Sequence, residues 1–319
     1  MEKILTVSIA AYNVEKYIEK TLSKFVVPNV MKEIEVLIIN DGSTDGTVKI
    51  SKKFVEKYPD TFVLLNKDNG GWGSTVNMGI DHAHGKYFKQ LDGDDYFDSE
   101  TLEGFINILN DHNEDLIYTN YLMFDDETDK IIDNINIKDS LINKRININD
   151  LYIDFPLAMH ACTFKTNMLK KESLDITEKC FYTDAEYLIK SLVRVKNVFF
   201  APINVYCYRV GREGQSVSVQ GFRKHYKEHI KVVMNLLDLY NKLEDSNVKK
   251  IVFYRLNLMI DYQYHMFLYL ENSKAHAKEL KEFDNYIKDN YNQFYKTNKK
   301  RIKIFRIFGI TVYPFILYR

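Results

Sequence analysis

The sequence has few cysteines, prolines and glycines, and it carries no excess charge of either sign. Its 319 residues include 3 Cys, 5 Pro and 13 Gly, and 44 basic residues balance 44 acidic ones. Three cysteines without a Cys-x-x-Cys pair argue against a zinc ribbon or a redox dithiol. A balanced charge gives no overall basic field to recruit nucleic acid, and so little proline and glycine excludes a collagen-like chain.

Long apolar runs and targeting signals are missing as well. The chain has no stretch of about 18 uncharged apolar residues, which a membrane-spanning helix requires. Its first residues, MEKILTVSIAAYN, lack the basic, apolar and small-residue regions of a signal peptide. Together with the cysteine usage, these absences favour a reducing, cytoplasmic location.

The chain does have a large apolar fraction, with 45% hydrophobic and 14% aromatic residues. At this length it can bury a sizeable core and form one large domain or about two of ordinary size. Apolar runs without polar alternation, typical of parallel strands covered on both faces, alternate with helical patterns. We predict an α/β fold with a doubly wound, mostly parallel sheet, whose strands lie at 4–11, 35–40, 62–65, 87–91 and 116–121.

The rest of the chain differs in character from this first part. Residues 125–150 are polar and predict a connecting segment with one or two edge strands, and helical patterns dominate from residue 224. We therefore expect one domain over 1–220, with a first half 1–125 and a second half 126–220. A helical C-terminal region over 221–319 follows it.

Three carboxylates, Asp92, Asp94 and Asp95, lie within four residues after the predicted strand 87–91. Carboxylates this close repel one another unless a cation neutralises them. Ligands of parallel sheets bind beyond the carboxyl ends of the strands, and hard oxygen ligands suit Mg²⁺ or Mn²⁺. A solvated acidic turn in which Asp98 caps the next helix is the other interpretation.

Two glycine-containing turns follow other predicted strands. Gly42 permits a tight turn after Asp41, whose carboxylate could accept the N–H of a nucleobase, although the segment can also be only a turn. Asn69, Gly70 and Gly71 open a predicted helix. Glycines let the backbone approach a ligand, and free N–H groups at a helix start favour phosphate.

A candidate general base lies in the segment Thr183-Asp184-Ala185-Glu186. The segment matches a capping box, which explains Thr183 and Glu186 structurally. Asp184 would then lie in the first helical turn, where the helix dipole keeps its carboxylate ionised, as a general base requires.

A loop with two guanidinium groups follows at residues 208–216. Its Arg209 and Arg212 forks, with the polar donors Gln215 and Ser216, suit a diphosphate. A solvated loop in which Arg212 pairs with Glu213 is the alternative.

Taken in order, these segments resemble family 2 glycosyltransferases of the GT-A fold in their bacterial soluble form, over about residues 4–220. VSIAAYN is similar to the family's first strand and nucleotide-binding turn, and INDGSTDGT to its second-strand motif. NGGWGSTVNMGI and LDGDD resemble the third and fourth motifs, TDAEY the general-base motif, and YRVGREGQSVS the segment that closes over the diphosphate. The QxxRW signature of processive synthases is absent.

The resemblance implies roles for the matching positions. Asp184 would be the catalytic base, and Asp94 with Asp92 would bind Mn²⁺ or Mg²⁺. Trp72 and His160 would contact the acceptor, and Lys67 would supply a contact that Val76 lacks where the family often has Arg. The nucleotide would be bound by Ala10, Ala11, Tyr12, Asp41, Asn69, Gly70, Gly71 and Asp92, and its diphosphate by Arg209, Arg212, Gln215 and Ser216.

The function implied is inverting, non-processive transfer of a hexosyl or N-acetylhexosaminyl group from a nucleotide-sugar, most often a UDP-sugar. The acceptor would be a saccharide or lipid-linked saccharide in bacterial surface polysaccharide assembly. A sugar nucleotidyltransferase is one alternative, but it should show a Gly-rich basic loop where this chain has Ala10-Ala11-Tyr12-Asn13. A non-catalytic nucleotide-sugar-binding protein is the other, and it would not need Asp184.

The C-terminal residues 296–319 combine a basic cluster with the apolar stretch IFGITVYPFILY. This combination is typical of a segment that lies on an anionic membrane surface, and it predicts peripheral attachment to the inner face of the cell membrane. A tail that docks on the helical region is the alternative.

Overall fold

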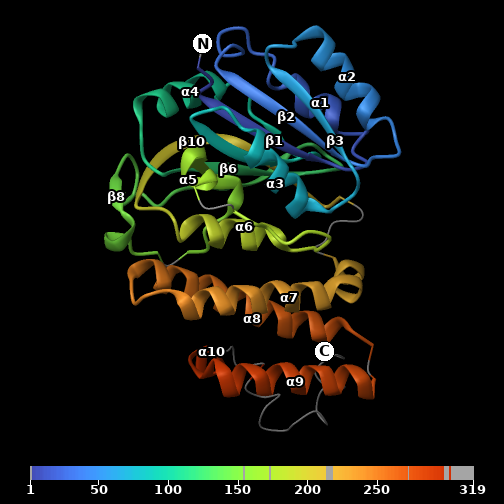
Figure 1. The fold of residues 1–319 in the computed structure, drawn as a ribbon, viewed down its shortest axis with the longest axis vertical. Coiled ribbons are helices and arrows are strands. Elements are labelled where there is room, and N and C mark those ends of the chain that lie inside the picture. Colours follow the sequence, from blue (N-terminus) through green and yellow to red (C-terminus); the bar gives the residue numbers. More distant parts are fainter. Residues whose placement is uncertain are drawn as a thin grey trace. The chain divides into compact units, whose positions relative to one another are not determined.

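The computed structural model of the chain describes residues 2–153, 155–171, 174–212, 218–271, 273–297 and 302. It divides into two compact units, Met1–Arg212 and Glu213–Arg319. The first unit contains the sheet and its helices, and the described part of the second contains only helices (Figure 1). The domain limits predicted at 1–220 and 221–319 stay a prediction.

Among the described residues, ten strands form one mixed sheet in the order β3-β2-β1-β4-β9-β6-β10-β5, with β7 beside β6 and β8 beside β10. β1 to β4 are parallel, as are β6 and β10, and β9 joins the two groups by antiparallel pairing. The predicted doubly wound, mostly parallel sheet is confirmed. The strands are β1 (Leu5–Ala11), β2 (Ile34–Asp41), β3 (Phe62–Lys67), β4 (Tyr87–Asp92), β5 (Tyr96–Phe97), β6 (Leu116–Asp125), β7 (Ile131–Ile135), β8 (Arg145–Asn147), β9 (Cys162–Lys165) and β10 (Asn197–Val210).

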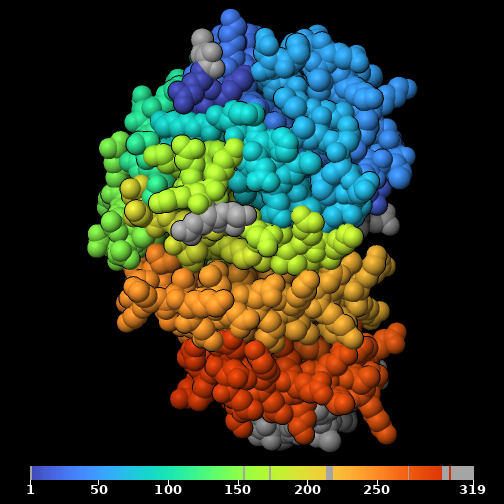
Figure 2. All heavy atoms as spheres, in the orientation of Figure 1, coloured from blue at the N-terminus to red at the C-terminus, as the bar shows by residue number. Residues whose placement is uncertain are grey.

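The sheet forms where predicted because its central strands are largely apolar and are buried on both faces. β2 is buried at all eight of its positions, which requires cover on each side of the sheet. The polar segment 125–150 carries only the short strands β7 and β8, as expected. Figure 2 shows side chains of this unit, in blue through green, packed against one another on the face turned to the reader.

Amphipathic helices cover the faces of the sheet. On α4, Leu102, Phe105, Ile106 and Leu109 are buried at the spacing that places them on one helix face, and all four belong to the hydrophobic core. The helices of this unit are α1 (Ile18–Ser23), α2 (Thr47–Lys57), α3 (Trp72–His82), α4 (Leu102–Asp111), α5 (Thr166–Lys170) and α6 (Thr183–Leu192), with the 3₁₀ turns η1 (Ile148–Asp150) and η2 (Met159–Ala161).

The second unit confirms the predicted helical C-terminal region. Three of its helices begin with a serine N-cap, because the hydroxyls of Ser218, Ser246 and Ser273 accept backbone N–H groups of the first turn. No helix among the described residues is both long and apolar enough to cross a membrane. Most of the tail 296–319 lies outside the described residues. The helices are α7 (Val219–Lys242), α8 (Asn247–Tyr269), α9 (Lys274–Asn290) and α10 (Asn292–Thr297).

Candidate active site

The carboxyl ends of β1, β2 and β4 meet at one edge of the sheet. β1 lies between the other two strands, with Ala10 in register with Asp92 of β4 and Ala11 in register with Asn40 of β2. Tyr12, the next residue after β1, is 51% exposed. Strand order reverses about β1, and the crevice at such a point is where open α/β sheets bind ligands.

The aspartates after β4 have three different environments. Asp95 is only 1% exposed, and it accepts hydrogen bonds from Tyr206 Oη (2.6 Å) and the Arg209 backbone N–H (2.7 Å). Asp92 Oδ1 accepts a 2.6 Å hydrogen bond from the indole Nε1 of Trp72. Asp94 is partly exposed, as Asp92 is, and pairs with a guanidinium group, described below.

Burial and mutual repulsion change the protonation of this cluster. Burial, followed by repulsion from Asp94 and Asp184, raises the pKa of Asp92 to about 7. Burial followed by repulsion from Asp94 and Asp92 raises the pKa of Asp95 well above its ordinary value. A positive charge among these carboxylates would lower both pKa values, because it favours the ionised form.

His160 of η2 completes a group that could hold a metal ion. One ring nitrogen of His160 and one carboxylate oxygen each of Asp92 and Asp95 lie within 4.8 Å of one another. The ring centroid lies 4.8 Å from that of Tyr206 and 4.3 Å from that of Tyr208. The sequence predicted a different set, Asp92 with Asp94, and placed His160 at the acceptor.

A buried lysine fixes the position of η2, the turn that carries His160. Lys89 is 0% exposed, and its Nζ donates to the carbonyl oxygens of His160 (2.8 Å) and Cys162 (3.1 Å). Burial lowers the pKa of Lys89 to about 7. The lysine thereby fixes the backbone that carries the imidazole, and the sequence analysis did not identify it.

The buried side chain of Asp41 fixes the conformation of the glycine loop, residues 69–71. The carboxylate is buried and accepts the backbone N–H groups of Gly70 and Gly71 and the Nζ of Lys67, all at 2.8 Å, and the Asn69 side chain donates to its carbonyl oxygen. A buried carboxylate needs such donors. The two amides that were expected to be free for phosphate are therefore bonded to Asp41, and Lys67 is held beside them.

Asp184 lies in the first turn of α6, as expected. After burial, which is the first cause of both shifts, its charge contributes to the raised pKa values of Asp92 and Tyr208. The predicted capping box is wrong, because Tyr182 is the N-cap residue and no side chain caps the helix. The hydroxyl of Thr183 has no partner among the described residues.

Glu186 has a different role from the predicted cap. It is 0% exposed and accepts both the backbone N–H and the hydroxyl of Thr177 at 3.1 Å. Lys190 pairs with the same carboxylate at 2.7 Å. Glu186 thus ties the segment before α6 to the helix that carries Asp184.

Arg209, near the end of β10, and Arg212, just after that strand, differ in accessibility. Arg209 is 5% exposed; its Nε donates to the Asp94 carbonyl oxygen (2.6 Å) and Nη1 to Asp126 (2.7 Å). The Arg212 side chain is 30% exposed, and its Nε lies 2.7 Å from Asp94 Oδ2. Arg212 is the more accessible of the two guanidinium groups. The other predicted diphosphate ligands, Gln215 and Ser216, lie outside the described residues.

Aromatic residues of the site were also missed by sequence reasoning. Tyr206 and Tyr208 are two positions apart on β10 and so share a face of the strand, where they contact His160. The Arg209 guanidinium lies 4.6 Å from the ring centroids of both Tyr17 and Phe124. Alternating tyrosines in a strand were the available signal, but nothing in that pattern indicates which residues they contact.

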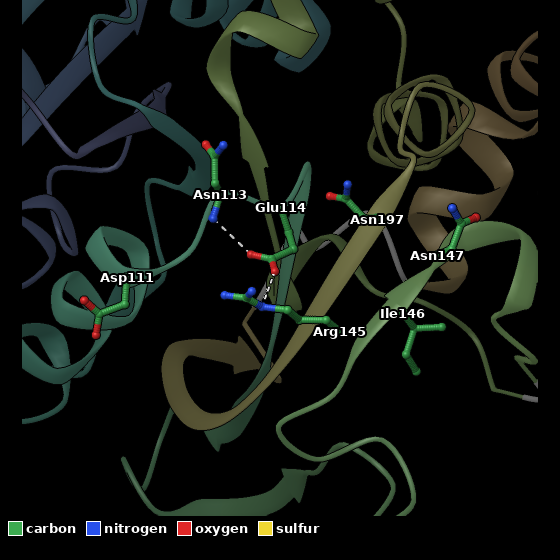
Figure 3. A pocket seen from close by; sticks show the side chains of 7 residues that line it. All are labelled: Asp111, Asn113, Glu114, Arg145, Ile146, Asn147 and Asn197. Atoms are coloured by element: carbon green, nitrogen blue, oxygen red, sulfur yellow. Dashed lines mark hydrogen bonds and ion pairs between the residues drawn. The ribbon is translucent and has the colours of Figure 1, made fainter.

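A separate hollow of about 350 Å³ lies at the opposite, amino ends of β6 and β10. Its lining includes Glu114 and Arg145, whose side chains point toward one another and pair at 2.6 Å, and Asn197 at the start of β10 (Figure 3). None of the predicted site residues lines it, so it is distinct from the aspartate cluster.

The mixed sheet with an acidic cluster after β4 and a helical C-terminal region defines a GT-A type fold. A model of the family described as "Glycosyl transferase family 2" matches residues 6–176. The chain therefore belongs to glycosyl transferase family 2. This confirms the family resemblance and removes the sugar nucleotidyltransferase alternative.

Relatives and solved structures agree with the family. The chain is 26% identical to the minor teichoic acid biosynthesis protein GgaB of Bacillus subtilis (strain 168) over 249 residues, 76% of this chain but only 27% of GgaB. It is 27% identical to the uncharacterised glycosyltransferase RP339 of Rickettsia prowazekii (strain Madrid E) over 272 residues, 83% of this chain and 77% of RP339.

The fold is similar to that of S. aureus TarS 1–349 solved in complex with UDP-GlcNAc, with a TM-score of 0.69 at 19% identity over 91% of this chain and 82% of TarS. It is also similar to the mannosyltransferase PcManGT from Pyrobaculum calidifontis in complex with GDP-Man and Mn²⁺. That match has a TM-score of 0.56 at 14% identity over 93% of this chain and 84% of PcManGT.

Proposed function

We propose that the chain transfers a sugar with inversion from a UDP-sugar to a hydroxyl of a saccharide or lipid-linked saccharide acceptor. The observation that carries the proposal is the group of Asp92, Asp95 and His160, whose ligand atoms lie within 4.8 Å of one another, in a chain of this family whose helix α6 carries Asp184 in its first turn. In such an arrangement one carboxylate can accept a proton, while the separate acidic cluster binds a cation. The UDP-GlcNAc complex of TarS supports UDP as the nucleotide, and the name of GgaB supports surface polymer assembly.

The nucleotide binds at the carboxyl ends of β1 and β2 in this proposal. Tyr12 presents an exposed ring beside Ala10 and Ala11, which suits stacking on a base. Asp41 Oδ2 accepts the Gly71 N–H, and a carboxylate oxygen has capacity for a further donor such as a nucleobase N–H. Asn69, Gly70 and Gly71 then shape the loop beside the nucleotide.

The metal site in this proposal consists of Asp92, Asp95 and His160, and it takes Mn²⁺ or Mg²⁺. Burial, followed by repulsion among the aspartates, raises the pKa values of Asp92 and Asp95, and a divalent cation would favour their ionised forms. Two carboxylates suit either ion, whereas the imidazole favours Mn²⁺ over the oxygen-seeking Mg²⁺. When bound, the cation supplies positive charge that neutralises the departing diphosphate. Asp94, predicted as a ligand, pairs with Arg212 instead, and its carboxylate becomes available to the cation when Arg212 turns to the diphosphate.

Asp184 accepts the proton of the acceptor hydroxyl as that oxygen bonds to the anomeric carbon. The bond from this carbon to the diphosphate breaks, and UDP leaves with the electron pair. Arg212 turns from Asp94 to the diphosphate. Arg209, the more buried arginine, stays in place and stabilises the backbone around Asp94. Base catalysis of this kind contributes about 10²–10⁴-fold to the rate.

The test is turnover of a panel of nucleotide-sugars with Mn²⁺, followed by the variant Asp184→Asn. We expect the variant to lose transfer by about 10²–10⁴-fold and to bind UDP normally. Because Trp72 is the single tryptophan and is bonded to Asp92, its fluorescence reports binding. Asp111→Asn, an exposed change on α4, is the matched control. Turnover of Asp184→Asn equal to that of the control contradicts the proposed base, and UDP-dependent fluorescence without any turnover favours the non-catalytic alternative.

We propose further that the protein acts in the cytoplasm, attached peripherally to the inner face of the cell membrane. Residues 296–306 contain six basic residues, and no acidic residue follows Asp289, which suits an anionic lipid surface. Flotation with anionic liposomes, with and without residues 296–319, tests this. Equal flotation of both forms contradicts it.

A further inference from the structure

The hollow at the amino ends of β6 and β10 is lined mostly by polar side chains, and the proposed function assigns no role to the hollow. Its volume of about 350 Å³ lies within the range of about 300–1,000 Å³ that is typical of small-molecule sites. The lining comes from three separate parts of the chain, which are the stretch that joins α4 to β6, the strand β8 and the start of β10 (Figure 3).

An ion pair in the hollow is satisfied by protein groups. Glu114 Oε1 lies 2.6 Å from Arg145 Nε. Glu114 Oε2 accepts the Asn113 backbone N–H at 3.0 Å and lies 3.1 Å from His112 Nδ1. The His112 ring in turn stacks on Phe199, with ring centroids 3.6 Å apart. Because the residues that line the hollow carry no net positive charge, the hollow does not attract an anion such as phosphate.

Three exposed asparagines of the hollow have their side-chain oxygens bonded and their amino groups open. Oδ1 of Asn147 and Oδ1 of Asn197 each accept a backbone N–H, at 2.9 and 2.8 Å. Oδ1 of Asn113 accepts the Nζ of Lys165 at 2.8 Å. Each Nδ2 group has two N–H donors, and none of them has an acceptor among the residues that the structure describes. The bonded oxygens thus fix which way each amide presents its donors.

Pairing of β8 with β10 brings two of these amides together. Asn197 is in antiparallel register with Asn147, so their side chains are neighbours on one face of the sheet. Arg145 lies two positions before Asn147 on β8 and therefore shares that face. The donors of the hollow are held by strand pairing and by their own hydrogen bonds before any ligand arrives. A donor array of this kind loses little conformational freedom on binding.

Open donors without a net positive charge favour a neutral ligand that offers many acceptor oxygens. A saccharide hydroxyl has two lone pairs for amide N–H groups and one hydrogen to donate in return, and it needs no counter-charge. Ile146 adds an apolar side chain to the lining, which suits the C–H groups of a sugar ring. A small site with a few placed polar groups beside apolar surface is the usual composition of a ligand pocket.

We propose that this hollow binds a neutral saccharide, whose hydroxyl oxygens accept hydrogen bonds from the amides of Asn113, Asn147 and Asn197. The hollow lies at the opposite ends of the strands from the aspartate cluster. The bound saccharide is therefore a unit of the acceptor glycan that is remote from the hydroxyl receiving the sugar. This use of the hollow in transfer rests on the proposed function, whereas saccharide binding itself does not.

Saturation-transfer NMR on the full chain measures this binding without any turnover. The probes are maltotriose, cellotriose and tri-N-acetylchitotriose, each titrated with and without UDP and Mn²⁺. We expect a trisaccharide to bind equally well in both conditions, because the hollow is separate from the nucleotide site. The double variant Asn113→Ala/Asn147→Ser removes two of the three amides, while serine can still cap the turn η1. We expect it to raise the Kd about tenfold.

The matched control makes the same two substitutions at exposed asparagines outside the hollow, Asn136→Ala with Asn134→Ser, and should leave the Kd unchanged. Thermal unfolding shows whether the double variant folds. If it does not, Asn113→Ala alone replaces it, since the Asn113 side chain is bonded only to Lys165, and a rise in Kd of about threefold is then expected.

A Kd of the folded variant equal to that of the wild type overturns the proposal. So does loss of binding when UDP and Mn²⁺ are added, displacement of the saccharide by inorganic phosphate, or the absence of binding by all three trisaccharides. In turnover, the double variant should raise the KM for a trisaccharide acceptor and leave the KM for a monosaccharide acceptor unchanged. Binding that depends on the asparagines in a chain without turnover supports the saccharide site, and only the proposed function then fails.

Discussion

Replacing Asp92 by asparagine should stabilise the metal-free protein at alkaline pH, although it removes a group from the candidate site. Burial is the first cause that raises the pKa of Asp92 from 3.8 to about 7, and repulsion from Asp94 is the second. Asparagine has the same shape and can still accept the Trp72 hydrogen bond, but it carries no charge to bury. The variant therefore removes a cost that the wild type bears whenever this carboxyl is ionised.

The size and direction of this effect follow from the two pKa values. Between pH 3.8 and about 7 the unfolded chain has lost the Asp92 proton and the folded chain has kept it, so wild-type stability falls as pH rises through this window. A shift of about three pH units corresponds to about 4 kcal/mol. The repulsion is shared among neighbouring carboxylates, so their contributions to stability do not simply add. We therefore expect Asp92→Asn alone to raise the free energy of unfolding by about 2 kcal/mol.

Thermal unfolding with EDTA at pH 4 and pH 8 measures this stabilisation. A gain of about 2 kcal/mol in a unit of this size raises Tm by about 4–8 °C, and the gain should be present at pH 8 and nearly absent at pH 4. Mn²⁺ should raise the Tm of the wild type at pH 8 and leave that of Asp92→Asn unchanged. The exposed change Asp111→Asn serves as the control. An Asp92→Asn protein no more stable than wild type at pH 8 refutes the reasoning.

Three further changes test the contacts around the cluster. Tyr206→Phe removes the hydroxyl that donates to Asp95 and should weaken Mn²⁺ binding about tenfold by raising the Asp95 pKa further; unchanged calorimetric affinity would contradict this. Arg212→Gln should weaken UDP binding about tenfold, with a smaller salt dependence, because it removes the more exposed guanidinium, and Trp72 fluorescence measures both. Gly73→Ala should destabilise the protein by about 1–3 kcal/mol, since the added Cβ would clash with the carbonyl oxygen of Thr177. A Tm equal to that of the wild type would contradict this.

The sheet could be predicted from sequence because its strands are apolar at successive positions. β2 reads IEVLIIND and is buried throughout, so a run of this kind has few structural alternatives. The positions of Asp41 and Asp92 at strand ends followed from the same pattern. The start of α6 near Asp184 was also correct, since the apolar period of the helix begins there.

The finer features of the site depend on contacts between residues distant in sequence. Which of three adjacent aspartates is buried is decided by Tyr206 and the Arg209 backbone, more than 100 positions away along the chain. Glu186 has the spacing of a capping residue, but burial against Thr177 gives it a different partner. Local patterns carry no information on either outcome, because both are set by how β10 and α6 pack in the tertiary structure.

The proposed mechanism depends on a divalent cation that binds in the aspartate cluster opposite Asp184. Anomalous diffraction from crystals of the full chain soaked with MnCl₂ and UDP locates the ion directly. We expect one strong manganese peak within coordination distance of Asp92, Asp95 and His160, with the Asp184 carboxylate facing the same space. Bound UDP without a manganese peak at these side chains, or Asp184 turned away from them, would show that the proposed site is wrong.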